Sequence, residues 1–254
     1  MAADQQGLAF IFLSSFYSRA MGGQVLFQDA LAARLELIKP TKTDIEACLM
    51  KHPLKLTKGV QKVVELLHAR GTPVYLVSGG FRQVRQFDIY IIILMLRGQG
   101  DVRRQSHILS SIFATKIYTS FFNYFFQMIN PVAEALKIPL HRVYANNLIF
   151  NEDGSFQGFD PSEPTSRDGG KPAVIQSLKD AHGYETVVMV GDGATDMQAR
   201  PPASAFIGFG GVVVRDSVKA GADWFVTDFQ VLLTSITCPG KLIHLTIAVF
   251  QKRF

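Results

Sequence analysis

Two carboxylates follow an apolar run in the stretch Val187–Met197, which reads VVMVGDGATDM. The apolar run has the length and composition of a buried parallel strand. Gly191 and Gly193 permit a tight turn at its carboxyl end, the edge where open α/β sheets place their ligand sites. Asp192 and Asp196 bring carboxylate oxygens to that turn, and Mg²⁺ prefers such ligands. The stretch therefore predicts a Mg²⁺ site, whereas an Asp-Gly pair alone indicates only a turn.

Two further motifs have the chemistry to bind phosphate oxygens. Ser78, Gly79 and Gly80 end another apolar run, and a serine hydroxyl and backbone N–H groups are suitable donors. Lys171 follows two glycines at the start of a predicted helix, where a cation and a helix N-terminus together favour an anion. Taken alone, the first motif is an ordinary turn and the second is a solvated lysine. Together with the two aspartates, they form three motifs that can meet at one edge of a sheet.

The composition argues against several classes of protein. The 254 residues suffice for one large domain or two small ones, and Cys48 and Cys238 form neither a disulfide framework nor a metal-binding set. The longest apolar stretch, Ile89–Leu96, is too short to span a bilayer. The net charge of +5 is concentrated in 84–127 and 234–254, so we expect no nucleic-acid or membrane partner. The first residues lack the basic region of a signal peptide, so a cytoplasmic location is expected.

Residues 21–56 are predicted to form a pair of helices. The first, Gln24–Ile38, carries apolar residues at helical spacing and is stopped by Pro40. The second is capped by Thr43 or Thr41, because a threonine hydroxyl can accept a hydrogen bond from the first helical turn.

The following residues alternate between strands and helices, which predicts a parallel sheet covered by helices. The predicted helices are Val60–Arg70, which ends at Gly71, and Pro172–His182, with proline in its first position. The predicted strands are Val74–Val77, Val187–Val190, Ala205–Ile207 and Trp224–Val226. Leu148–Phe150 and Phe156–Phe159 flank the turn Glu152-Asp153-Gly154 and predict a hairpin.

Three segments, 1–20, 84–127 and 234–254, do not fit this alternation. Segment 84–127 separates a loop from the helix that the loop would enter, and it has neither a clean period nor turn chemistry. Its ends, Val84-Arg85 and Phe125–Gln127, are compatible with the codons of a splice donor and acceptor. We interpret 84–127 as an intron translated in frame. The alternatives are a surface insertion, which loops tolerate, and a membrane-surface segment, for which no amphipathic period is found.

Six local sequences resemble the haloacid-dehalogenase-like phosphatases, and more closely the phosphoserine phosphatase family among them. They are RAMGG, ALAARLELIKP, LVSGGFRQ, GFDPSEPTSRDGGK, GDGATDM and AFIGFGG. The resemblance implies a Rossmann-like parallel sheet covered by helices, with a small helical cap and a first core strand that is missing or replaced. The implied domains are an atypical N-terminus (1–20), a partial helical cap (21–56), a phosphatase core (57–83 and 128–233), an anomalous insertion (84–127) and an atypical C-terminal tail (234–254).

The resemblance also implies a reaction and a set of site residues. The reaction is Mg²⁺-dependent hydrolysis of O-phospho-L-serine to L-serine and phosphate through an aspartyl-phosphate, the last step of serine biosynthesis. Asp192 matches the Mg²⁺ ligand, Asp196 matches an acid that supports it, and Lys171 matches the lysine that neutralises nucleophile and phosphate. The matches to substrate-binding positions are Met21, Gly22, Arg34, Ser78, Gly79, Gly80 and Thr195. The arginine would clamp the substrate carboxylate; the alternative is a solvated helix arginine.

The nucleophile motif of that family, Asp-x-Asp, is missing from the 254 residues. Asp4 precedes an apolar run, Leu8–Leu13, which we expect to fill the place of the first core strand with Ser14 and Ser15 at its tip. Serine brings no carboxylate to a metal and is a poor nucleophile without a base. Two hypotheses therefore stay open: a phosphoserine phosphatase, and a catalytically inactive truncated or mis-spliced product. The resemblance to plant-type members favours a plastid for a longer form of the protein.

Overall fold

The computed structural model describes residues 26–51, 54–82, 129–237 and 246–249. Within them, six parallel strands form the main sheet in the order β2-β1-β8-β5-β6-β7. The strands are β1 (Val74–Phe81), β2 (Val143–Asn146), β5 (Val187–Gly191), β6 (Ala205–Phe209), β7 (Trp224–Val226) and β8 (Thr246–Val249). The predicted α/β class is confirmed, and all the carboxyl ends of the strands meet at one edge of the sheet.

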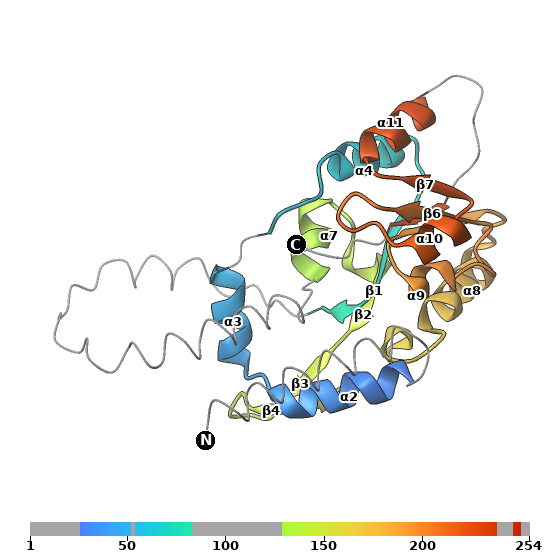
Figure 1. Cartoon of the computed structure of the whole chain (residues 1–254). Coiled ribbons are helices and arrows are strands. Elements are labelled where there is room, and N and C mark those ends of the chain that lie inside the picture. Colours follow the sequence, from blue (N-terminus) through green and yellow to red (C-terminus); the bar gives the residue numbers. More distant parts are fainter. Residues whose placement is uncertain (1–25, 52–53, 83–128, 238–245, 250–254) are drawn as a thin grey trace, which may run out of the picture.

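Helices cover both faces of this sheet. Helices α4 (Val60–Ala69), α7 (Ile129–Ala135) and α11 (Phe229–Thr237) pack on one face, while α8 (Gly170–His182) and α10 (Asp216–Gly221) pack on the other (Figure 1). In β5, Val188 and Val190 join the first core, whereas Val187 and Met189 join the second. Both faces of β5 are therefore buried, which explains why its sequence is apolar throughout.

The strand in the middle of the sheet comes from the C-terminal tail. β8 pairs in parallel with β1 and with β5, and Val249 lies opposite Leu76 on one side and Val190 on the other. The expectation that Leu8–Leu13 fills this place is wrong, because Thr246–Val249 occupies it; residues 8–13 lie outside the described residues. The sequence TIAV suits a strand with neighbours on both sides, and it contains no carboxylate.

A smaller unit forms the cap. It consists of α2 (Phe27–Ile38), α3 (Lys42–Lys51) and an antiparallel hairpin of β3 (Leu148–Phe150) and β4 (Phe156–Phe159), and Figure 1 shows α2 running beside β3 and β4. Its apolar core joins the two helices to the hairpin and to the end of β1 through Leu31, Leu35, Ile45, Cys48, Phe81 and Leu148. The hairpin prediction is confirmed, and so is the apolar face of the helical pair.

Thr41, and not Thr43, caps α3. The Thr41 hydroxyl accepts the Asp44 backbone N–H at 3.1 Å, and the Asp44 carboxylate accepts the Thr41 N–H at 3.0 Å. This reciprocal pair is a capping box, which satisfies two backbone donors at the helix start.

Several element bounds differ from the prediction. Helix α8 begins at Gly170, so Pro172 is its third residue and not its first. β1 continues past Val77 to Phe81, and β2 was not predicted, because VYAN is short and lacks flanking turn signals. Segment 84–127 lies outside the described residues, so its interpretation stays a prediction. In the part of the chain that the structure describes, no helix is long and apolar enough to cross a membrane.

Candidate active site

The loop after β5 is built around a close approach between two of its residues. Asp196 lies in the short helix α9 (Ala194–Met197) and is fully buried. Its side chain packs so tightly on Gly191 that a Cβ there would lie 2.3 Å from the Asp196 Cγ. The Gly193 N–H donates to Asp196 Oδ2 at 3.0 Å. The carboxylate is therefore fixed in a position that only glycine at 191 permits.

Lys171 joins this loop from helix α8. Its ammonium group forms a salt bridge with Asp196 Oδ1 and donates to the Thr195 hydroxyl at 3.2 Å. The exposed fractions of the two charged side chains are 8% for the lysine and 0% for the aspartate. The structure thus brings together Lys171, Thr195 and Asp196, three of the predicted site residues; the two charged side chains are buried and Thr195 is half-buried.

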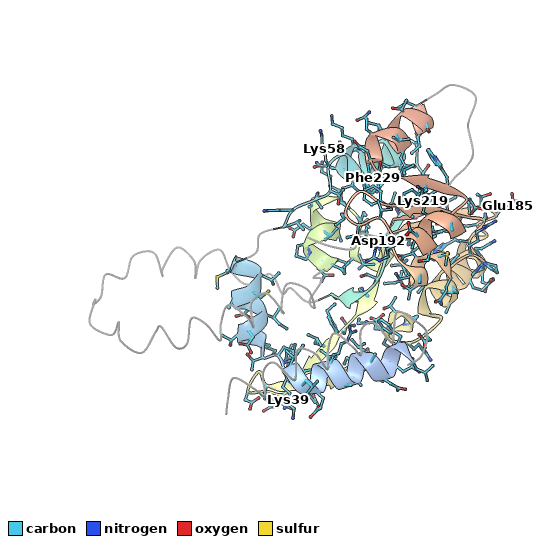
Figure 2. All side chains as sticks on the ribbon, viewed as in Figure 1. Lys39, Lys58, Glu185, Asp192, Lys219 and Phe229 are labelled. Carbon is cyan, nitrogen blue, oxygen red and sulfur yellow. The ribbon has the colours of Figure 1, made fainter. Side chains whose placement is uncertain are left out.

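Asp192 is held by an arginine that the sequence did not reveal. Arg215 Nη1 donates to the Asp192 backbone carbonyl at 2.8 Å and to its Oδ2 at 2.7 Å. Asp192 is buried, whereas Lys219 of α10 is exposed; both are labelled in Figure 2. In the sequence, only its position as a single charge after the apolar run Val212–Val214 could have marked Arg215 as a site residue, and this is a weak indication.

The other oxygen of Asp192 fits a hard cation. Asp192 Oδ1 is buried and has no hydrogen-bond partner within the described residues. A buried carboxylate oxygen without a donor is costly, and Mg²⁺ prefers such oxygens, commonly one or two carboxylates together with water and phosphate. The described residues contain no group of three or more His, Cys, Asp or Glu that could hold a metal ion. Asp192 therefore fits as one ligand of a Mg²⁺ ion whose remaining ligands come from elsewhere.

The second motif, Ser78-Gly79-Gly80, lies in the last part of β1, toward the same edge of the sheet. Ser78 is buried, and its hydroxyl accepts the Gly80 N–H at 3.0 Å. The Gly79 carbonyl accepts the side-chain amide of Asn146 at 3.0 Å. Asn146, at the end of β2, is fully buried and had not been identified from the sequence.

The cap reaches this loop through the first residues of α2. A Cβ at Gly79 would lie 3.1 Å from the Phe27 ring, so the ring rests directly on the glycine. The Phe27 N–H donates to Asp168 Oδ2 at 3.0 Å, and the Asp168 N–H donates to Gln28 Oε1 at 3.1 Å. These reciprocal hydrogen bonds attach the cap helix to the loop that leads into Lys171.

Arg34 of α2 is a buried residue, so the alternative of a solvated helix arginine is wrong. Its Nε donates to the Ala30 carbonyl at 3.0 Å within the same helix. A role as a clamp for a substrate carboxylate stays a prediction. Met21 and Gly22, the other predicted cap residues, lie outside the described residues.

A tyrosine cluster lies toward the other end of β1 and has no acid–base role at neutral pH. The Tyr75 and Tyr184 hydroxyls are 2.8 Å apart. Burial, reinforced by this hydrogen bond, raises the pKa of Tyr75 well above its usual value. Burial likewise raises the pKa of Tyr144. These phenols stay protonated, so we assign the chemistry to the opposite end of the strands.

Comparison with known proteins gives consistent results. The chain is 39% identical over 226 residues to the chloroplastic phosphoserine phosphatase of Arabidopsis thaliana, with 88% of this chain and 62% of the relative covered. It is 38% identical over 221 residues to phosphoserine phosphatase of Mus musculus, with 87% of this chain and 79% of the relative covered. The chain thus spans less than two thirds of the Arabidopsis relative. No family model matches the chain.

Solved structures agree on the fold. A phosphoserine phosphohydrolase-like protein from Francisella tularensis superposes with a TM-score of 0.62 at 22% identity, covering 93% of this chain and 89% of that one. A substrate-bound phosphoserine phosphatase complex gives a TM-score of 0.59 at 20% identity, covering 88% of this chain and 83% of that one. At these identities the likeness establishes the fold alone.

The parallel sheet and the helical cap give this chain the haloacid-dehalogenase-like fold, with polar residues at the carboxyl edge of the sheet. The sequence identity to the Mus musculus relative, which covers most of this chain and of the relative, identifies the family within this fold. The chain belongs to the phosphoserine phosphatase family.

Proposed function

We propose that this chain acts on O-phospho-L-serine and hydrolyses it, with Mg²⁺, to L-serine and phosphate, as the last step of serine biosynthesis. The observation that carries the proposal is the contact of Lys171 with Thr195 and Asp196, in the same loop as Asp192 with its buried, unpartnered Oδ1. A cation, a hydroxyl and a metal-ligand oxygen at one sheet edge are the components that bind a phosphate ester. Relatives named phosphoserine phosphatase support the choice of ester.

Each residue of the site has a part in this proposal. Lys171 is held in place by Asp196 and Thr195, and its charge would neutralise phosphate oxygens. The Ser78 hydroxyl and the Gly79 N–H would bind further phosphate oxygens, and Gly80, whose N–H donates to the Ser78 hydroxyl, would orient that hydroxyl.

The substrate-recognition residues come from the cap. Arg34 would bind the carboxylate of the amino acid in a bidentate manner, for which a planar guanidinium is suited. Met21 and Gly22 would complete this part of the site. Thr195 would bring its hydroxyl close to the substrate.

Asp192 would hold Mg²⁺ through Oδ1, while Arg215 occupies Oδ2 and fixes the rotamer. When bound, Mg²⁺ stabilises negative charge on phosphate oxygens. Asp196 would support this arrangement without contacting the metal, because its carboxylate accepts the Gly193 N–H and pairs with the Lys171 ammonium group.

A second candidate function is phosphoserine binding without hydrolysis. The observation in its favour is β8, the central strand, which reads TIAV and supplies no carboxylate between β1 and β5. The family reaction uses an aspartate as nucleophile, and an enzyme that lacks its nucleophile keeps only a trace of its activity. The missing Asp-x-Asp motif is therefore the observation on which this second candidate rests.

Two assays on the purified full chain separate the candidates. Phosphate release from O-phospho-L-serine is followed with Mg²⁺ and with EDTA, and binding of the same compound is measured by calorimetry. Asp192→Asn tests the metal ligand, and Lys219→Met, a change at an exposed site, is the control. Turnover that needs Mg²⁺ and Asp192 supports the phosphatase, and binding without turnover supports the second candidate. If the chain neither binds nor hydrolyses the compound, both candidate functions are contradicted.

The partner and the location follow from the same proposal. A small molecule is the expected ligand, and we propose no role in nucleic-acid or membrane binding. The Arabidopsis relative is named chloroplastic, which supports a plastid location over the cytoplasm for a longer form of the protein. Fractionation of plastids with an antibody to this chain tests that choice.

A further inference from the structure

We propose that Asn146, oriented by Thr165, is a positioning residue that holds the Ser78–Gly80 loop in its anion-binding shape. The inference rests on the proposed function in one respect, namely that the loop binds phosphate. The geometry itself comes from the hydrogen bonds around Asn146, which connect β1, β2 and the segment that leads into α8.

The loop is a bulge in the β1–β2 ladder. Val77 lies opposite Tyr144, and the next paired residues are Phe81 and Asn146, so β1 advances four residues while β2 advances two. The residues between them therefore leave the regular pattern of parallel hydrogen bonds. Backbone groups that leave a ladder inside a protein need other partners.

Asn146 supplies one of these partners. Its Nδ2 donates to the Gly79 carbonyl at 3.0 Å, and its own backbone carbonyl accepts the Arg82 N–H at 2.8 Å, where the strand pair resumes. The Gly80 N–H is taken by the Ser78 hydroxyl. The bulge is thus closed by one side chain from the neighbouring strand and one from within the loop.

Thr165 fixes which way the Asn146 amide points. Its hydroxyl donates to Asn146 Oδ1 at 2.8 Å, and both side chains are buried. The Gly79 carbonyl accepts hydrogen bonds but cannot donate, so only the orientation with Nδ2 toward Gly79 satisfies the amide on both sides. A buried amide left without either partner would be costly, which explains why the two hydrogen bonds occur together.

The same pair connects the loop to the start of α8. Thr165 lies in the 3-10 turn η2 (Pro164–Ser166), and a Cβ at Gly170 would lie 2.0 Å from the Pro164 carbonyl oxygen and 2.9 Å from the Thr165 Cα. The turn therefore packs directly on the helix start that carries Lys171. Asn146 and Thr165 therefore fix the position of the Ser78–Gly80 loop relative to Lys171.

The test uses Asn146→Leu and Thr165→Val, which keep the number and branching of side-chain heavy atoms and remove the hydrogen bonds. Asn147→Leu is the matched control, because its Nδ2 donates to Glu163 Oε1 at 2.8 Å and not to the loop. Binding of inorganic phosphate and of O-phospho-L-serine is measured by calorimetry with Mg²⁺, and hydrogen exchange of the Gly80 amide is followed by NMR. Urea unfolding shows that each variant is folded under the conditions used.

We expect Asn146→Leu to weaken phosphate binding and to speed Gly80 exchange, each by about tenfold, the effect of one lost hydrogen bond that orders a loop. Thr165→Val should have a smaller effect of the same kind, and none in the Asn146→Leu background, because Thr165 acts through Asn146. Asn147→Leu should change neither quantity. If Asn146 and Thr165 only supported the fold, the three variants would lose stability without this order of effects on phosphate binding and Gly80 exchange.

Failure of the two proposals can be told apart. If the unaltered chain binds neither phosphate nor phosphoserine, the proposed function is wrong, and Gly80 exchange still decides the role of Asn146. If folded Asn146→Leu keeps the Gly80 exchange rate and any phosphate affinity of the unaltered chain, the positioning role is overturned.

Discussion

Replacing Lys171 by methionine removes the positive charge from a pair that lies almost entirely inside the protein. Methionine keeps the apolar stem of the side chain, so the packing of α8 changes little. The Asp196 carboxylate loses its counter-charge while it stays fully buried. The substitution therefore isolates the effect of leaving one buried charge without its partner.

The size of the effect follows from the burial. Removing one member of a buried ion pair costs about 3–5 kcal/mol, because the remaining charge is not compensated by solvent. Asp196 still accepts the Gly193 N–H at 3.0 Å, so we expect a loss near the lower end of that range. With an m-value of about 2 kcal/mol/M in urea, the unfolding midpoint should fall by about 1.5 M.

The assay is urea unfolding followed by circular dichroism. Lys171→Met is compared with the double variant Lys171→Met/Asp196→Asn, which has no charge at either position and should regain about 2 kcal/mol of the loss. Lys219→Met on the exposed side of α10 is the control and should change the free energy of unfolding by less than about 0.5 kcal/mol. A loss below about 1 kcal/mol for Lys171→Met, or a double variant less stable than the single one, would refute the reasoning.

Two further predictions concern stability. Burial, aided by the charge of Arg142, lowers the pKa of His68 in the folded protein. As the pH drops below about 6.5, the unfolded chain therefore binds the proton more readily than the folded chain, and the free energy of unfolding should fall. His68→Phe should flatten this pH dependence in urea titrations, and an unchanged slope would contradict the assignment. Gly191→Ala places a Cβ 2.3 Å from the Asp196 Cγ and should lower the free energy of unfolding by about 1–3 kcal/mol in the same assay. The control is Gly158→Ala, which should be nearly neutral because a Cβ there meets no atom within 4 Å. Equal effects at both glycines would argue against crowding at Gly191.

The alternation of strands and helices could be predicted because each signal was local. The run of apolar residues in β5 is buried on both faces, and the glycine after it opens the turn that carries Asp192. The hairpin of β3 and β4 was equally clear, since Asp153 and Gly154 supply turn chemistry between two apolar runs.

The central strand could not be predicted in the same way. Thr246–Val249 is a short apolar segment like many others, and its place depends on pairing with β1 and β5, which lie far away in the chain. Arg215 and Asn146 escaped notice for a related reason. Each acts on a residue that is 23 or 67 positions away, and no local pattern encodes such a contact.

The most direct test of the proposed function is a ³¹P NMR time course of O-phospho-L-serine with the purified full chain and Mg²⁺. We predict that the phosphoserine signal is replaced by that of inorganic phosphate, and that EDTA stops the conversion. A phosphoserine signal whose intensity, shift and width all stay constant in the presence of the chain would contradict the account, because it would mean that the site neither binds nor hydrolyses this ester.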